Sequence, residues 1–452
     1  MAKHARSPLL VALAVALAAT GALSTLERQS SPSAVPSGLA VANHAESTAL
    51  YCTGLTAPGS GTYGHVVLVN ITGAGRTVML QVSSNTGQHA TRQLRLAGHA
   101  TRTISPSAFV SGTAYGVSAV VDGGGVVAEE IAATSTAQAP CAASGVTSWY
   151  ASGFDTTLGS TATLSVYNPT ATPAVFNVST YSSSGFAAPA PFQGFSVGAH
   201  DEAVLDLGKE IVNISDVGVR VNVLRGSIAI VGVQQSGSVY SFVTGVGTPA
   251  NSLWFPQVTT VKGALAQLRV ANPNDRPADV TVDVTLGQFK VVPRTLTVRA
   301  YASALLSITP NSAIPAAGFA SLALRSSQPV VVTLAAGTTS GLGLSSPAMP
   351  SRAFLMSDYS GRGFCSETVT NTSSRPLNVS FTRIALNGQT SVSGSAQVAA
   401  GATSAVLSLF RAIKNLRGAT LLITAPRGAL VVATTLPSTP AGVEVVPVLN
   451  GG

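Results

Sequence analysis

Hydrophobic and polar residues alternate along much of this chain, which is the pattern of half-buried β-strands. The segment ADVTVDVTL at 278–286 places an apolar residue at every second position, with Asp or Thr between them. Side chains on a strand point to opposite faces in turn, so one face of such a strand is buried and the other meets water. Within the strand-rich part of the chain helical signal is slight: we predict one or two helical turns crossing between sheets at 207–214 and at 409–416.

Landmarks that recur along the chain divide it into repeats of about 100 residues. Each repeat begins with a short aromatic start, continues into a strand that ends in a turn Asn, and reaches an apolar run 55 to 58 residues later. The turn Asn residues are 98, 104 and 99 positions apart. We interpret each as a residue whose side chain caps its own turn. These residues are Asn70, Asn168, Asn272 and Asn371.

A repeat of this length with several short strands is typical of an immunoglobulin-like β-sandwich. The predicted fold class is therefore all-β, with four tandem immunoglobulin-like β-sandwich repeats after an N-terminal signal or anchor helix. The predicted boundaries are 1–27 for the signal peptide or signal anchor, 28–48 for a Ser/Pro/Ala linker, and 49–144, 145–248, 249–348 and 349–452 for repeats one to four.

The first residues have the composition of an export signal. Lys3 and Arg6 precede the apolar segment LLVALAVALAATGAL at 9–23, as in secretory signals. Residues 7–26 are also long enough to cross a hydrocarbon core, for which about 20 residues suffice. A cleaved signal peptide and an uncleaved anchor both fit, and the lack of a clear A-x-A site favours the anchor. We therefore predict an extracytoplasmic protein, either secreted or held at the membrane by this helix.

Charge excludes one class of partner. Charged residues make up 9% of the chain, against about 25% in an average soluble protein. The net charge is +8, but the basic residues are scattered and no aromatic ladder lies between them. Nucleic-acid binding would require a basic stripe, so we predict no nucleic-acid partner.

Two of the three cysteines lie in the first repeat. Cys52 follows its aromatic start, and Cys141 lies just beyond its late apolar run. The first and last strands of a sandwich are neighbours in many such folds, and an extracytoplasmic compartment is oxidising, so we predict a Cys52–Cys141 disulfide. Two buried free thiols are the alternative. Cys365 is predicted to be a lone buried thiol.

No group of residues predicts catalysis, metal binding or a cofactor. The six histidines lack the spacing of zinc ligands, G-x-S-x-G is absent, and the GxGxxG match at 59–64 precedes a strand where that motif requires a helix. Glu129-Glu130 and Asp201-Glu202 are adjacent carboxylates. Neighbours on a strand point to opposite faces, so neither pair could act together as acid and base. We predict no catalytic residue, no metal and no cofactor.

Trp149 and Trp254 are the weak candidates for ligand binding. Either ring could stack on a sugar, although their matching places in two repeats indicate a role at the end of a sandwich or in a joint between repeats. Exposed tryptophans in a groove would favour carbohydrate binding, and buried ones would favour a scaffold.

Three motifs carry a resemblance to a known family. W-Y-x-S-G at 149–153, Y-N-P at 167–169 and G-S-I-A-I-V at 226–231, behind a short N-terminal anchor, resemble an actinobacterial family of large secreted or membrane-anchored proteins of unknown function. The likeness covers most of residues 50–450 and is strongest in 147–235. It implies tandem immunoglobulin-like sandwiches and no established activity, so it assigns no catalytic residues.

Together these patterns favour a protein that is not an enzyme. We expect a structural or binding protein of the bacterial cell envelope, whose partner is an envelope polysaccharide or an envelope protein. The alternatives are an adhesin for cell contact and an envelope enzyme with a site between repeats.

Overall fold

The computed structural model is all-β. It describes residues 47–56, 64–132, 137–237, 239–286, 289–311, 313–316, 318–338, 341–348, 353–358, 368–384, 390–405, 420–425, 431–434 and 443–447. This part of the chain contains strands, turns and short 3-10 turns but no α-helix. None of it forms a helix with the length and hydrophobicity of a membrane span. The predicted signal or anchor at 1–27 lies outside the described residues.

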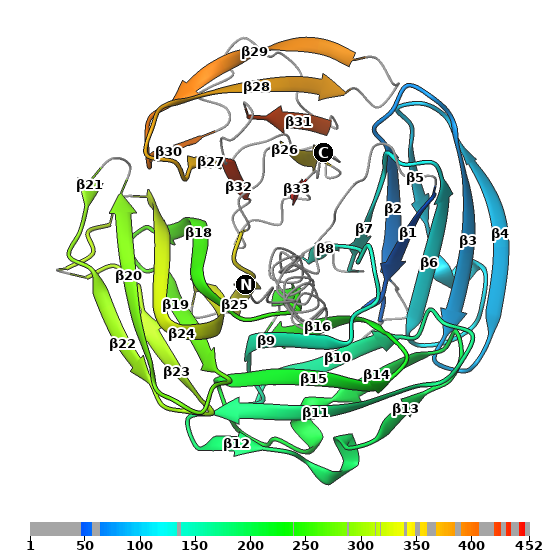
Figure 1. Ribbon diagram of the computed structural model, residues 1–452, viewed down its shortest axis with the longest axis horizontal. Helices are drawn as coiled ribbons and strands as arrows, with labels where there is room; N and C mark the ends of the chain where they lie inside the picture. The colour runs from blue at the N-terminus through cyan, green and yellow to red at the C-terminus, as the bar shows by residue number, and fades with distance from the viewer. Residues whose placement is uncertain are drawn as a thin grey trace, which may run out of the picture. The chain divides into compact units, whose positions relative to one another are not determined.

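The first eight strands form two antiparallel sheets, which we call the first sheet pair (Figure 1). One sheet has the order β1-β6-β3-β4 and the other β5-β2-β7-β8. A 3-10 turn, η1, links β5 to β6. The bounds are β1 Ser47–Cys52, β2 His65–Asn70, β3 Arg76–Ser84, β4 His89–Leu96, β5 Thr101–Ile104, η1 Pro106–Ala108, β6 Tyr115–Asp122, β7 Val126–Ile131 and β8 Gln138–Pro140.

The second sheet pair repeats this order. Strands β12-β11-β15-β9 form one sheet, with β13 also paired to β11, and β14-β10-β16-β17 form the other. The bounds are β9 Ser148–Phe154, β10 Ser160–Tyr167, β11 Ala174–Ser182, β12 Gly185–Ala187, η2 Ala190–Phe192, β13 Phe195–Val197, β14 Glu202–Asp206, η3 Leu207–Lys209, β15 Val217–Arg225, β16 Ala229–Ser236 and β17 Val239–Val243.

The helical turn expected at 207–214 is the 3-10 turn η3. The Asp206 side chain accepts the Gly208 N–H at 2.9 Å and so caps it. The turn lies between β14 and β15, which belong to different sheets, as the sequence predicted. Its counterpart at 409–416 lies outside the described residues.

The third sheet pair shares one long strand between its two sheets. β24 pairs with β18 and β20 in one sheet and with β19 and β25 in the other. β22 and β21 extend the first of these through β20, and β23 extends the second through β19. The bounds are β18 Ala250–Thr260, β19 Leu265–Asn272, β20 Ala278–Leu286, β21 Phe289–Lys290, β22 Arg294–Val298, β23 Ala302–Ser307, β24 Gly318–Thr338 and β25 Gly341–Ser345.

The fourth sheet pair differs at its last strand. Its sheets are β29-β28-β31-β26-β33 and β30-β27-β32, so β33 extends the larger sheet, whereas β8, β17 and β25 extend the other one. The bounds are β26 Ala353–Asp358, β27 Thr368–Asn371, β28 Leu377–Ile384, β29 Thr390–Val398, β30 Thr403–Ala405, β31 Thr420–Thr424, β32 Val431–Thr434 and β33 Val443–Pro447.

Alternating apolar residues build the core of each pair, as the sequence pattern predicted. In β20, alternate residues from Ala278 to Leu286 are buried, and the residues between them are exposed or half-buried. The core clusters of the first three pairs each contain residues from both sheets, so the sheets pack face to face.

Each turn Asn is fully buried and ties two turns together. In the first pair, Asn70 Nδ2 donates to the carbonyls of Ala74 at 2.8 Å and Ala97 at 2.9 Å, while its Oδ1 accepts the Thr72 N–H at 3.0 Å. Asn168, Asn272 and Asn371 make the same set of bonds in the other pairs. The expectation that these residues cap their own turns is therefore confirmed.

Candidate functional site in the first joint

Consecutive sheet pairs meet at equivalent positions, and we call the three contact regions the first, second and third joint. In each, the end of one pair's first strand contacts the residue three positions before the next pair's turn Asn. The contacts are Gly54 N donating to Ser165 Oγ at 2.9 Å, Ser152 Oγ donating to the Arg269 carbonyl at 2.9 Å, and Thr368 Oγ1 donating to Gln257 Oε1 at 3.3 Å.

Two glycines allow the close approach of the pairs at the first joint. Gly54 follows β1 with φ of +89°, a conformation that other residues rarely adopt, and a Cβ there would lie 2.6 Å from Val231 Cγ1. A Cβ at Gly116 of β6 would lie 2.3 Å from Tyr167 Cδ2. Any side chain at either position would therefore push the second pair away from the first.

A carboxyl group of the second pair is buried in this joint. Glu202 on β14 is 4% exposed. Its Oε1 accepts hydrogen bonds from Thr53 Oγ1 at 2.6 Å and from Ser165 Oγ at 2.5 Å. Its Oε2 has no hydrogen-bond partner among the described residues. The group is thus held by one residue from each side of the joint and is only half satisfied.

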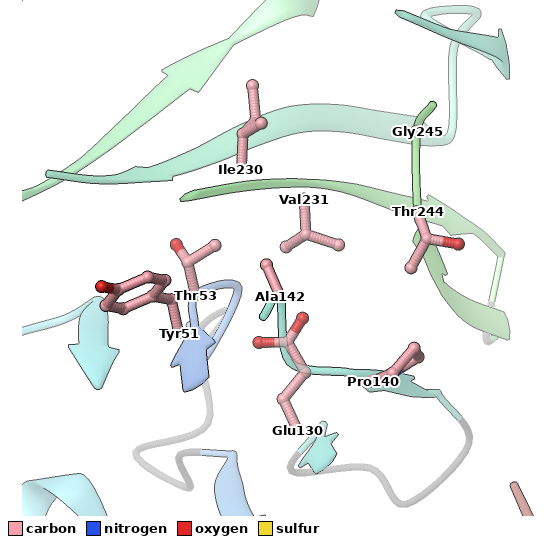
Figure 2. Close-up of a pocket in the computed structure, with 9 residues that line it drawn as sticks. All are labelled: Tyr51, Thr53, Glu130, Pro140, Ala142, Ile230, Val231, Thr244 and Gly245. Atoms are coloured by element: carbon pink, nitrogen blue, oxygen red, sulfur yellow. The ribbon is translucent and has the colours of Figure 1, made fainter. Parts of the chain in front are cut away.

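A second carboxyl group enters the joint from the first pair. Glu130 on β7 is 2% exposed, and its Oε2 also has no hydrogen-bond partner in the described part of the chain. Figure 2 shows its carboxyl group pointing toward Thr53 and Val231, into a small cavity that residues of both pairs line. The centre of a water molecule can occupy a volume of about 10 Å³ in this cavity, which is about enough for one buried water.

Burial governs the protonation of both groups. It raises the pKa of Glu202 from 4.5 to about 7, against the opposing effect of the hydrogen bonds from Ser165 and Thr53. It also raises the pKa of Glu130 well above its usual value, opposed by the Thr53 backbone N–H and reinforced by the charge of Glu202. Neither group forms an ion pair among the described residues. The arrangement therefore favours protonated carboxyls.

The chemistry open to this cluster is the binding and release of protons. No group of three or more His, Cys, Asp or Glu residues that could hold a metal occurs in the described ranges. The cavity is too small for a substrate, since ligand sites usually occupy about 300–1,000 Å³. The cavity beside this cluster is therefore smaller than an active site usually is.

A larger groove lies in the same joint. It has a volume of about 230 Å³. Its lining is uncharged and consists mainly of hydroxyl, amide and aliphatic groups from both pairs: Thr56, Asn85, Thr113, Ala114, Thr161, Thr163, Val204, Val233, Gln235 and Tyr240. It is the larger of the two spaces described at this joint and could admit one ring-sized polar group.

The second joint places a cation where the first has a hydroxyl group. Arg269 occupies the position of Ser165, is 5% exposed, and donates from Nη1 to the Gly153 carbonyl at 2.8 Å. Its Nη2 lies 3.6 Å from Asp155 Oδ2. Burial lowers the pKa of Arg269, while the charges of Asp155 and Asp216 oppose that fall. The buried charge here has partners of opposite sign.

The structure places the two candidate tryptophans differently. Trp149 is fully buried in the core of the second pair, where Gly245 packs against its ring. It is therefore not available to stack on a sugar, and this candidate is corrected to a core residue. Trp254 is half-buried on β18 and forms an isolated bridge with Ala348. The two residues do not share a groove.

Cys52 and Cys141 are joined by a disulfide with an S–S distance of 2.03 Å. The bond lies beside the first joint, because Ala142 pairs with Tyr51 and both residues line the small cavity. Cys365 lies outside the described residues.

Reasoning from the sequence missed the joint cluster. Glu130 and Glu202 each have an adjacent carboxylate that points to the opposite face, which excludes an acid–base pair between neighbours. The two instead enter the same joint from different sheet pairs. One signal could have found the region: Ser165, Arg269 and Thr368 all stand three residues before a turn Asn, and a polar side chain there interrupts an apolar strand.

The fold and this site define an all-β protein of packed sheet pairs whose joints bury polar and titratable side chains. The chain belongs to a family of unknown function, DUF5719, whose model matches residues 132–407, or 276 of 452 residues. No curated protein matches it.

Solved structures show only distant likenesses. The Anabaena sensory rhodopsin transducer is 18% identical with a TM-score of 0.18, over 19% of this chain and 95% of its own. The Thermotoga maritima 1070 protein is 20% identical with a TM-score of 0.19, over 22% and 90%. A tetra-tandem repeat from the extending region of a large adhesion protein is 13% identical with a TM-score of 0.12, over 87% and 100%. None of these carries an argument about function.

Proposed function

We propose that this chain is a non-enzymatic structural or binding protein of the bacterial cell envelope. In this proposal, four immunoglobulin-like sandwiches of actinobacterial origin follow an N-terminal signal or anchor and present their surfaces outside the cytoplasm. The partner is an envelope polysaccharide or an envelope protein.

The observation that carries the structural role is the recurrence of buried polar contacts in consecutive joints. Modules joined by free linkers leave such side chains in water, and their relative motion is the default expectation. Here Ser165, Arg269 and Thr368 are buried and bonded across their joints at equivalent positions. Joints bonded in this way suit a protein that holds binding surfaces at set spacings.

The groove of the first joint favours an uncharged polysaccharide as the partner. Hydroxyl and amide groups hydrogen-bond sugar hydroxyls, whereas an acidic polymer would call for a cluster of arginines or lysines. None of the ten residues that line the groove is charged at neutral pH. The nearly buried Tyr240 adds an aromatic surface.

Co-sedimentation of the purified chain with isolated cell envelope, before and after its polysaccharide is stripped, tests this proposal. We expect binding that resists salt and is lost on stripping. The double variant Thr161→Ala/Gln235→Ala, which alters the groove, should weaken it, and Thr295→Ala, an exposed threonine of β22, should leave it unchanged.

Two results would count against it. Absence of binding to either preparation would exclude the polysaccharide as the partner. Cross-linking in intact cells would then have to identify a protein partner. Failure to recover the protein in any envelope fraction would remove the envelope role altogether.

A further inference from the structure

We propose that the first joint is a proton-controlled latch, which is closed while Glu130 and Glu202 carry protons and loosens when they lose them. This inference goes beyond the envelope role and does not depend on the identity of the partner. It rests on the way two buried carboxyl groups from different sheet pairs share one joint.

The two groups lie on opposite sides of the contact. Glu130 belongs to β7 of the first pair and Glu202 to β14 of the second, so repulsion between their charged forms acts on the joint and not within either core. Each is at least 96% buried, since 4% and 2% of their surfaces are exposed. Water cannot screen such charges without entering the joint.

The described residues that face this pair provide no compensating charge. β1 and the residues after it contribute Tyr51, Thr53 and the Gly54 N–H, and β10 contributes Ser165 and Tyr167. β6 contributes Gly116, and β16, β17 and the segments around them contribute only uncharged residues to the cavity.

Further charged groups lie nearby without neutralising the pair. Glu129 is buried beside Glu130 on β7 and points to the opposite face. His89 of β4 and Asp201 come within 3.6 Å of each other across the same joint, but both side chains are more than a third exposed. Asp201 lies against His89 and is itself an acidic residue, so it does not neutralise the charge of Glu202.

The unpartnered oxygen atoms fit the protonated state. The protonated Glu130 carboxyl can turn its O–H toward the cavity that it lines, where one water fits, whereas an ionised Glu130 or Glu202 would leave a charged Oε2 without a hydrogen-bond partner among the described residues. The hydrogen bonds from Thr53 and Ser165 to Glu202 Oε1 fix the group in place and favour its charged form, but burial outweighs them and raises its pKa.

The direction of the pH effect follows from linkage. Burial raises the pKa of Glu202 to about 7, so the closed joint binds a proton more tightly than the open one does. The closed joint is therefore fully favoured below pH 4.5 and loses its advantage as the pH rises toward about 7. For Glu202 alone, the open-to-closed ratio should rise roughly 70-fold between pH 5 and pH 8.

Loosening would uncover an apolar surface. Beside the carboxyl groups, the joint buries alanines of the first pair against larger side chains of the second. These residues are Ala132, Ala137, Ala139, Val231, Val233, Tyr240 and Phe242. The latch would thus convert a change of pH into exposure of a surface that another molecule could bind.

Hydrogen–deuterium exchange of the full chain from pH 5 to pH 8, corrected for intrinsic rates, tests the latch. We expect protection of the Gly54 amide to fall by several tens of fold in the wild type and to stay constant in Glu130→Gln/Glu202→Gln. The Ser152–Gly153 segment of the second joint is the internal control and should not change in either protein.

Fluorescence gives a second measurement if the double variant does not fold. Trp149 packs on Gly245, which lines the cavity, so its emission should report opening without denaturation when it is measured in a Trp254→Phe background with and without Glu202→Gln. Unchanged protection at Gly54 across the pH range in the wild type would overturn the proposal. So would an equal pH response in the glutamine variants.

Discussion

The first and second joints form at equivalent positions of the chain but have opposite electrostatics. Both bring the end of one pair's first strand against the strand that precedes the next pair's turn Asn, and in both a glycine permits the approach. In the second joint a buried Arg269 lies beside Asp155 and bonds the Gly153 carbonyl. In the first, Glu130 and Glu202 are buried on opposite sides of the contact, and neither forms an ion pair among the described residues.

This difference teaches that one geometry can serve a permanent contact and a conditional one. A buried cation with acidic partners keeps its charge over the physiological pH range, so the second joint should not respond to pH. Buried carboxyls without a cation change state within that range. The following variants act on one joint and spare the other, in order of decreasing effect.

Removal of the disulfide should have the largest effect and should act on the first pair only. The chain-entropy model assigns about 4–5 kcal/mol to a loop of this length, whose cysteines are 89 residues apart. Urea unfolding of Cys52→Ala/Cys141→Ala should show this loss. Reductant should lower the stability of the wild type and leave the double variant unchanged. Equal sensitivity of the variant would contradict the assignment.

Arg269→Ala should destabilise the second joint by about 3–5 kcal/mol, because it removes the buried cation that pairs with Asp155 and donates to the Gly153 carbonyl. The control is Arg325→Ala, which breaks a pair with Asp283 at 2.9 Å whose arginine is 73% exposed. That change should cost at most about 1 kcal/mol. Similar losses in the two variants would show that burial does not decide the strength of these pairs.

Glu202→Gln should stabilise the protein at pH 8 and have little effect at pH 5. Glu202 keeps its proton up to a pKa of about 7 in the folded protein but only up to 4.5 in the unfolded chain, so the wild type loses up to about 3 kcal/mol of stability as the pH rises from 4.5 to about 7, and the variant does not. Denaturant unfolding at the two pH values measures this. Ser303→Ala, at the equivalent position of the second joint, should give the same change at both.

Gly116→Ala should have the smallest effect, about 1–3 kcal/mol, because its methyl group would overlap the Tyr167 ring at the first joint. The control is Gly394→Ala on β29, where a Cβ meets nothing within 4 Å. Thermal unfolding of the two variants checks the comparison. A Gly116→Ala protein as stable as the control would mean that the joint can open at little cost.

Local patterns predicted most of what lies within a sheet pair. Alternation predicted the strands, and the spacing of Asn70 and its counterparts identified turns whose caps the structure confirms. These features depend on residues a few positions apart, so their signal is contained in one short segment of the chain.

The joints could not be predicted in the same way. Glu130 and Glu202 are 72 positions apart, and their meeting depends on how one sheet pair packs against the next. The burial of Trp149 could not be predicted either, because an aromatic residue at the start of a strand suits both a core and a binding surface. Only the repeated position before each turn Asn carried information about the joints.

The strand β24 gives the third pair a mechanical property that the first two pairs lack. Its 21 residues run through both sheets, whereas glycine turns at 123–125 and around Gly226 divide the equivalent passage elsewhere. A force applied to one sheet is therefore transmitted to the other directly through the continuous backbone of β24. Under tension the sheets of the third pair cannot slide apart by loosening side-chain packing alone, and this pair should be the last of the first three to yield.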